Sequence, residues 1–319
     1  MLNLIRNELL KIFKRPGTYV MIGLLIFIIV VMGGIIKYQD SKSTAPDNQN
    51  WKQGLQTDIN ESKKQLQQMG DKIPDSQKVY FERDIAIKEY QIKHNISPNQ
   101  DYDGWEFVNS ASNIIQFAGL FTIIVAAGIV ASEFNWGTIK LLLIRPIARS
   151  RLLVAKYLTV LIFALLMLVI LFAFSSILGF ILFGTPETAI PYLKYYDGKV
   201  TEQSMFFHLI NYYGLQSITM LILATMAFMI SAVFRNSSLA IGLSIFLMFT
   251  GGQITSLLAA KFEWAKYILF ANTDLMQYFD GMPMVEGMTL GFSIIMLIVY
   301  FVIFQLLAHY VFNKRDVAA

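Results

Sequence analysis

Residues 133–151 read Glu-Phe-Asn-Trp-Gly-Thr-Ile-Lys-Leu-Leu-Leu-Ile-Arg-Pro-Ile-Ala-Arg-Ser-Arg and lie between two long apolar runs. The stretch carries four cations and one acid, and Gly137 and Pro146 interrupt it. The neighbouring runs, 107–132 and 152–183, reach or exceed the roughly 20 residues that cross a bilayer core of about 30 Å. A basic gap between two spans is typical of the cytoplasmic face. We interpret residues 133–151 as a cytoplasmic contact element.

The composition is that of a membrane protein. Of 319 residues, 55% are hydrophobic and 15% are charged, whereas soluble domains carry about 25% charged residues. The net charge of +4 is too small to indicate a nucleic-acid partner. Because the chain has no cysteine, it has neither disulfides nor thiolate metal ligands.

The apolar runs predict an all-α integral membrane protein with six transmembrane helices, at residues 18–36, 107–132, 152–183, 209–234, 238–258 and 287–310. The remaining segments are a cytoplasmic amphipathic helix (1–15), an extracellular helical hairpin domain (37–106), a cytoplasmic loop with a short amphipathic helix (133–151), an outer loop (184–208), an outer re-entrant region between spans 5 and 6 (260–286) and a cytoplasmic tail (311–319). We also expect a bend in span 5 at Gly251-Gly252, because two glycines weaken a helix.

The charges agree with this topology. The segments assigned to the inside contain twelve cations and three acids, and those assigned to the outside contain fourteen cations and nineteen acids. An excess of Lys and Arg marks the cytoplasmic side. We therefore expect a multi-pass protein of the cell (cytoplasmic) membrane with both termini in the cytoplasm.

Two segments allow alternative interpretations. Within 1–15 one helical face carries Leu2, Ile5, Leu9, Ile12 and Phe13, which predicts an interfacial amphipathic helix; the alternative is a basic flank before the first span. The 37–106 segment could capture or shield a substrate, or it could be a solvated cap without a ligand. The sequence leaves both questions open.

Catalytic chemistry is not supported. The middles of the apolar runs contain no charged residue, which disfavours coupling to an ion gradient. His94, His208 and His309 lie in three separate regions, so no metal site can be assembled from them. We assign no catalytic residue, no metal and no cofactor, and we do not expect an enzyme. The chain also lacks a Gly-x-x-x-x-Gly-Lys-Ser/Thr phosphate loop, so a separate partner subunit would have to bind and hydrolyse any ATP.

Polar residues inside the spans are candidates for a substrate path, above all Gln116, Gln216 and Gln253. Hydrogen bonds between helices are the competing explanation for such residues. In the loop, Phe134, Trp136 and the leucines that follow can form a short apolar ridge that ends at Arg145-Pro146. A protein-docking surface explains this ridge; the alternative is a passive loop that faces lipid.

The loop resembles the first cytoplasmic loop of type-2 ATP-binding-cassette (ABC) transporter permeases. The shared pattern is an acid, Gly-Thr, a leucine patch, proline and arginine, followed by Lys-Tyr at the start of the next span. The overall layout is similar to that family over nearly the whole chain. The resemblance implies that two permease subunits pair as a homodimer or heterodimer in the lipid bilayer, and that each docks a cytoplasmic ABC ATPase subunit. By this resemblance the ATPase-coupling residues are Glu133, Phe134, Trp136, Gly137, Thr138, Leu141, Leu142, Arg145 and Pro146.

These observations lead to the expectation of a membrane-spanning permease subunit of an ATP-driven ABC exporter. It would move a hydrophobic or amphipathic substrate, such as a peptide, an antibiotic or a lipid, out of the cell by alternating access. The alternative is a non-transporting membrane sensor or assembly protein that uses the 37–106 ectodomain. An intramembrane enzyme ranks last, because no set of acids, histidines or cysteines could perform its chemistry.

Overall fold

The computed structural model of the protein describes residues 1–42, 50–69, 75–98, 102–138, 147–185, 191–196, 198–279 and 281–314. In chain order the elements are α1 (Leu2–Phe13), α2 (Pro16–Lys42), α3 (Trp51–Met69), α4 (Asp75–His94), α5 (Gly104–Ala111), η2 (Ser112–Ile114), α6 (Ile115–Asn135), α8 (Arg149–Phe183), β1 (Tyr192–Tyr196), β2 (Lys199–Gln203), α9 (Met205–Phe234), α10 (Ser237–Ala259), η3 (Glu263–Tyr267), α11 (Leu269–Asn272), η4 (Leu275–Tyr278) and α12 (Leu290–Lys314).

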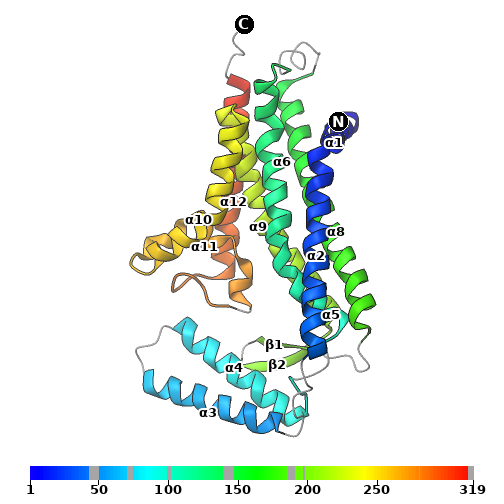
Figure 1. Ribbon diagram of the computed structural model, residues 1–319. Coiled ribbons are helices and arrows are strands. Elements are labelled where there is room, and N and C mark those ends of the chain that lie inside the picture. Colours follow the sequence, from blue (N-terminus) through cyan, green and yellow to red (C-terminus); the bar gives the residue numbers. More distant parts are fainter. Residues whose placement is uncertain are drawn as a thin grey trace.

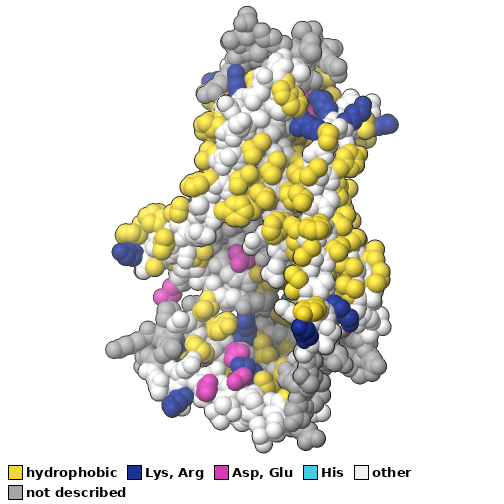
Figure 2. Space-filling view, in the orientation of Figure 1, with side chains coloured by type: hydrophobic (Ala, Val, Ile, Leu, Met, Phe, Trp, Pro, Cys, Tyr) yellow, Lys and Arg dark blue, Asp and Glu magenta, His cyan; other side chains and the backbone are white. Residues whose placement is uncertain are grey.

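Within these ranges six helical stretches are long and apolar enough to cross a membrane: α2, α5 to α6, α8, α9, α10 and α12. They run side by side, with α1 and the end of α12 at one end of the bundle and α3, α4 and the strands at the other (Figure 1). Hydrophobic side chains cover the long helices, Lys and Arg gather beside α1, and mixed charges lie over α3 and α4 (Figure 2). The chain is thus a multi-pass, predominantly helical membrane protein.

The α6 helix forms the centre of the bundle. Its small residues Ala126, Ala127 and Ala131 are fully buried, and α9 packs closely along it. The Ser231 hydroxyl on α9 accepts hydrogen bonds from the backbone N–H groups of Val130 and Ala131, at 3.3 and 3.0 Å. Small side chains permit this close approach of the two backbones.

Local sequence signals fix several helix ends. Pro16 begins α2, where a missing N–H costs nothing. Arg235 adopts a left-handed conformation (φ 56°) and ends α9, and the Asn236 side chain caps α10 by accepting a hydrogen bond from Leu239 N at 3.0 Å. This two-residue connection lies in the gap between the predicted spans 209–234 and 238–258.

The 35-residue α8 is longer than a bilayer requires, because at 1.5 Å per residue it extends over about 52 Å. Its last turns pack against α5 through glycines. A Cβ atom at Gly179 would lie 2.8 Å from the Gly104 carbonyl oxygen, and a Cβ atom at Gly104 would lie 2.5 Å from the Phe180 ring. Only glycine allows α5 and α8 to come this close.

At the end opposite to α1, the structure contains elements that the sequence analysis described only in part. Helices α3 and α4 pack on each other within the segment where we expected a helical hairpin, burying Leu55, Ile59 and Ile85. Residues 184–208, which we expected to be an outer loop, include the antiparallel pair β1–β2. This small hairpin is added to a fold that agrees with the predicted all-α membrane protein. Tyr192 stacks on His208, with ring centroids 3.4 Å apart, because β1 folds over the start of α9.

Between α10 and α12 the chain forms the short helices η3, α11 and η4 in place of another long helix. The α10 helix is unbroken from Ser237 to Ala259, through the Gly251-Gly252 pair where we expected a bend. The structure gives Gly251 another role. A Cβ atom at this position would overlap with the Phe270 ring of α11, so the glycine makes room for the packing of that helix.

Candidate functional site

The α1 helix attaches to the bundle through charged side chains as well as apolar ones. Its buried residues are Glu8 and Ile12, one helical turn apart, whereas Leu2 of the predicted apolar face is 82% exposed. The Thr18 hydroxyl of α2 donates a hydrogen bond of 2.6 Å to the Ile12 carbonyl oxygen and closes the connection between α1 and α2. The face of α1 that meets the bundle thus brings a carboxylate to it.

Four charged side chains meet there and form the cluster Glu8, Lys11, Glu133 and Lys156. Lys156 Nζ of α8 lies 2.6 Å from Glu8 Oε2 and 2.7 Å from Glu133 Oε1, and it donates a third hydrogen bond of 3.2 Å to the Ile129 carbonyl oxygen. Lys11 Nζ lies 2.5 Å from Glu8 Oε1 and 3.1 Å from Glu133 Oε1. Each lysine bridges both carboxylates, so the cluster joins α1, α6 and α8.

Three of the four side chains in the cluster are buried, and its two lysines balance its two carboxylates. The Lys156 side chain is 0% exposed and the two carboxylate side chains are 5% and 6% exposed. Burial opposes ionisation of Glu8, yet the Lys156 charge and the hydrogen bonds from both lysines outweigh it and lower the pKa of this carboxyl. Burial also opposes protonation of Lys11, but the bond to Glu8 and the charge of Glu133 outweigh it and raise the pKa of this amine. Glu8 and Lys11 are thus held in their charged forms at neutral pH.

The residues expected to couple to a partner lie in different environments. Trp136 is 64% exposed, and the Arg15 guanidinium carbon lies 4.9 Å from its ring centroid. Phe134 is half-buried, with the Phe312 ring at 6.4 Å and the Arg235 guanidinium at 4.5 Å. Gly137 has a φ of +70°, and the Thr138 hydroxyl donates a hydrogen bond of 3.4 Å to the Glu133 carbonyl oxygen. Leu141, Leu142, Arg145 and Pro146 lie outside the described residues.

Glu133 differs most from the expectation. We predicted that it belongs to the docking surface, but its carboxylate points into the cluster and is 6% exposed. Its other oxygen, Oε2, is buried and has no hydrogen-bond partner in the ranges that the structure describes. Glu133 contacts lysines of α1 and α8. This geometry suits a residue that links the loop to the bundle, and it does not suit one that forms an open contact surface.

The three glutamines expected along a substrate path are not gathered around one cavity. Gln116 and Gln253 are exposed and Gln216 is half-buried. None of them is among the described residues that line the two cavities beside β1, at the end opposite to α1. In the described part of the chain, no group of three or more His, Cys, Asp and Glu side chains could hold a metal ion.

Three members of the cluster, Glu8, Lys11 and Lys156, were missed as site residues. Their signal was present in the sequence: the segments predicted to lie inside contain only three acids, Glu8, Glu133 and Asp316, and Lys156 lies five residues inside an apolar run. A lysine at that depth needs a carboxylate partner. The partner of Lys156 could therefore have been sought among these three acids.

The chain resembles two curated proteins of Bacillus subtilis (strain 168). It is 52% identical over 320 residues to one called uncharacterized protein YhcI, with 100% of both chains covered. It is 28% identical over 239 residues to one called uncharacterized membrane protein YdbK, which covers 74% of this chain and 92% of that protein.

A family model matches residues 75–318, and its description is protein of unknown function (DUF2705). This finding overturns the expected membership of the type-2 ABC permease family. The loop pattern on which that expectation rested is short, and the other features that supported it are common to many membrane proteins. The match covers most of the chain, so the protein belongs to the DUF2705 family.

Proposed function

We propose that this chain is the membrane-spanning subunit of an ATP-driven exporter. It lacks a phosphate-binding loop of its own, so a separate cytoplasmic ATPase supplies the energy. The ATPase docks on residues 133–151 and on α1. Both termini lie in the cytoplasm, as the count of charges by side favours, and the protein lies in the cell membrane.

The charge cluster is the observation that carries this proposal. Lys156 holds Glu8 of α1 and Glu133 of α6 at 2.6 and 2.7 Å, and it belongs itself to α8. Glu133 and Arg149 border the loop, because α6 ends at Asn135 and α8 begins at Arg149. A force on the loop or on α1 therefore reaches both helices through ion pairs that water does not screen.

In this mechanism the movement of α6 and α8 alternates the access of the cargo path between inside and outside. The cargo is hydrophobic or amphipathic, because the middles of the spans carry no charge. Residues 260–286, with their short helices η3, α11 and η4, enter the membrane from outside and return. A second membrane subunit, either another copy or a relative, completes the path.

Copurification tests the proposal. A tagged full-length chain is extracted from membranes of its own organism, and the bound proteins are assayed for ATP hydrolysis. We expect a stoichiometric ATPase, and we expect Trp136→Ala to reduce its yield because Trp136 is the exposed aromatic residue at the start of the loop. The matched control is Tyr310→Ala. Tyr310 is 59% exposed and has the Lys314 amine 4.6 Å from its ring centroid, much as Trp136 has Arg15.

Absence of any ATPase from the purified chain, or equal loss with both variants, would argue against this function. The alternative is a non-transporting sensor or assembly protein, and one observation favours it. The outer helix α4 is fastened to the strands through the Tyr90 hydroxyl, which donates a hydrogen bond of 3.2 Å to Glu202. A ligand bound at the outer end could thus move α4. A signalling protein in place of an ATPase would identify this alternative.

A further inference from the structure

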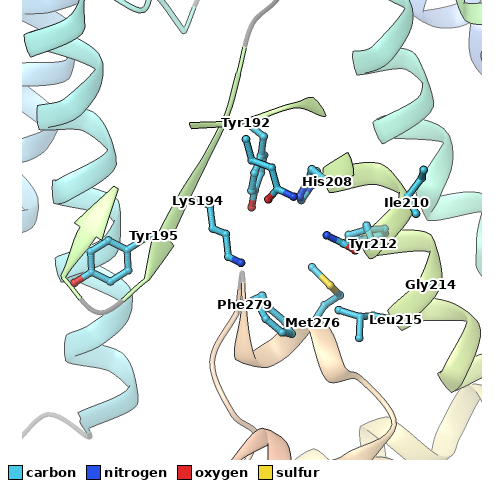
Figure 3. Close-up of a pocket in the computed structure, with 12 residues that line it drawn as sticks. Tyr192, Lys194, Tyr195, His208, Ile210, Tyr212, Gly214, Leu215, Met276 and Phe279 are labelled. Atoms are coloured by element: carbon cyan, nitrogen blue, oxygen red, sulfur yellow. The ribbon is translucent and has the colours of Figure 1, made fainter. Parts of the chain in front are cut away.

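A cavity of about 500 Å³ lies at the end of the molecule opposite to α1. It is formed where β1, the first turns of α9 and η4 meet (Figure 3). Its volume falls within the range of roughly 300–1,000 Å³ that small-molecule sites occupy. The cytoplasmic charge cluster contributes nothing to it.

The lining combines apolar walls with a single cation. Ile210, Leu215, Met276 and Phe279 supply apolar surface, and Lys194 is the one charged residue among the described lining residues. The Lys194 side chain extends from β1 toward Met276 and Phe279, into the space between the strand and η4 (Figure 3). An ammonium in this position can hold one anionic group, while the walls accept an apolar body.

One wall of the cavity is rigid. The rings of Tyr192 and His208 are nearly parallel, with an interplanar angle of 14° and centroids 3.4 Å apart. His208 is 8% exposed, so this stack is packed against the protein. Because β1 is paired with β2 from Tyr192 to Tyr196, the backbone that carries Lys194 is also fixed. A site whose walls are formed in advance binds its ligand at a lower entropic cost.

The surroundings favour a ligand that arrives from the membrane. Ile210 lines the cavity and is 45% exposed, and Phe207, one turn before it, is 60% exposed. Both residues belong to the first turns of α9, a helix long enough to cross the bilayer. On the other side α4 is fastened across the rim, because Arg83 Nη1 donates a hydrogen bond of 2.8 Å to the Phe279 carbonyl oxygen. The apolar opening therefore faces the level at which lipid headgroups lie.

We propose that this cavity binds an anionic amphiphile from the membrane, with its phosphate or carboxylate group on Lys194 and its alkyl chain along Ile210, Leu215 and Met276. The Gln203 and Asn211 side chains, which also line the cavity, can donate hydrogen bonds to the same headgroup. To call this amphiphile the exported cargo rests on the proposed function. The binding itself does not depend on it.

Photolabelling tests the site. The full-length chain is placed in nanodiscs of zwitterionic phosphatidylcholine and irradiated with a dodecyl phosphate that carries a diazirine near the end of its chain. We expect labelled residues within 205–215 and 275–279, identified by mass spectrometry. Unlabelled dodecyl phosphate should compete. Inorganic phosphate and dodecyltrimethylammonium at equal concentration should not, because the first lacks the apolar body and the second carries the wrong charge.

Two pairs of variants make the test specific. Lys194→Gln should weaken labelling about tenfold or more, as expected for loss of a hydrogen bond to a charged group. The control Lys199→Gln removes an exposed lysine from the same hairpin and should change nothing. Gly214→Leu should abolish labelling because it fills the cavity: a Cβ atom at Gly214 meets no heavy atom within 4 Å. Gly242→Leu on α10 is its control, since that position is open and lies away from the cavity.

Leucine is a better helix former than glycine, so both glycine variants should fold. Unchanged labelling in Lys194→Gln or in Gly214→Leu would overturn the proposal. Equal competition by dodecyltrimethylammonium would overturn the anion preference, and equal competition by inorganic phosphate would overturn the amphiphile. No ATPase is present in this experiment, so its failure rejects the site alone, and failure of copurification rejects the exporter alone.

Discussion

Replacement of Lys156 by methionine should destabilise the fold strongly. Methionine has a similar length but no charge, and the Lys156 ammonium serves three acceptors, Glu8, Glu133 and the Ile129 carbonyl oxygen. Without it, two carboxylates that are 5% and 6% exposed share only Lys11. Removal of one partner from a buried ion pair costs about 3–5 kcal/mol. We expect the free energy of unfolding to fall by that amount.

Lys11→Met is the matched control. Lys11 contacts the same two carboxylates, but its side chain is 44% exposed. Water therefore solvates much of its charge, and exposed ion pairs contribute at most about 1 kcal/mol. The two variants should differ by at least about 2 kcal/mol, the gap between these two classes of ion pair.

The measurement is the free energy of unfolding of the full chain in mixed micelles, titrated with a denaturing detergent. Adding Glu133→Gln to Lys156→Met should recover part of the loss, because it removes one of the two carboxylates left without a partner. Equal and small losses in Lys156→Met and Lys11→Met would refute the reasoning, since the cluster would then be solvated. The same result would remove the link between α1, α6 and α8 on which the proposed coupling depends.

Gly251→Ala should lower the free energy of unfolding by about 1–3 kcal/mol, because the added methyl group overlaps with the Phe270 ring. The neighbouring Gly252 faces open space, so Gly252→Ala should be neutral or stabilising by up to about 1 kcal/mol. Thermal unfolding of both variants checks this. The distance between spin labels on α1 and α8 measures whether α1 stays attached. This distance should not change between pH 4.5 and pH 10.5, which are the ordinary pKa values of Glu8 and Lys11. The pKa of Glu8 is lowered, so the contribution of Glu8 to stability is present above pH 4.5 and is lost as the pH falls through the pKa of the folded state. The pKa of Lys11 is raised, so the contribution of Lys11 is present below pH 10.5 and is lost as the pH rises through the pKa of the folded state. Detachment at pH 6 would contradict this assignment.

Much of the candidate site could not be read from the sequence. The loop after α6 was recognised because its charges and its Gly-Thr break are local features. The partners of Glu133 were not, because Lys156 and Lys11 lie 23 and 122 residues away along the chain and no local pattern joins them to it. The β1–β2 hairpin could have been predicted from Asp197-Gly198 between two strand-like runs, a common hairpin signal. It was overlooked because the whole of residues 184–208 was interpreted as an outer loop.

The sequence by itself determined the membrane class, the six long helices and the distribution of charges between the two ends. These properties depend on the length and polarity of each segment, and a bilayer selects helices by those two quantities alone. Only the tertiary structure decided that Glu133 is an internal ion-pair partner, that Gly251 makes room for Phe270, and that Lys194 faces an apolar cavity. Each of these depends on which helices pack side by side, and in a membrane that choice follows from shape and from buried polar contacts rather than from hydropathy.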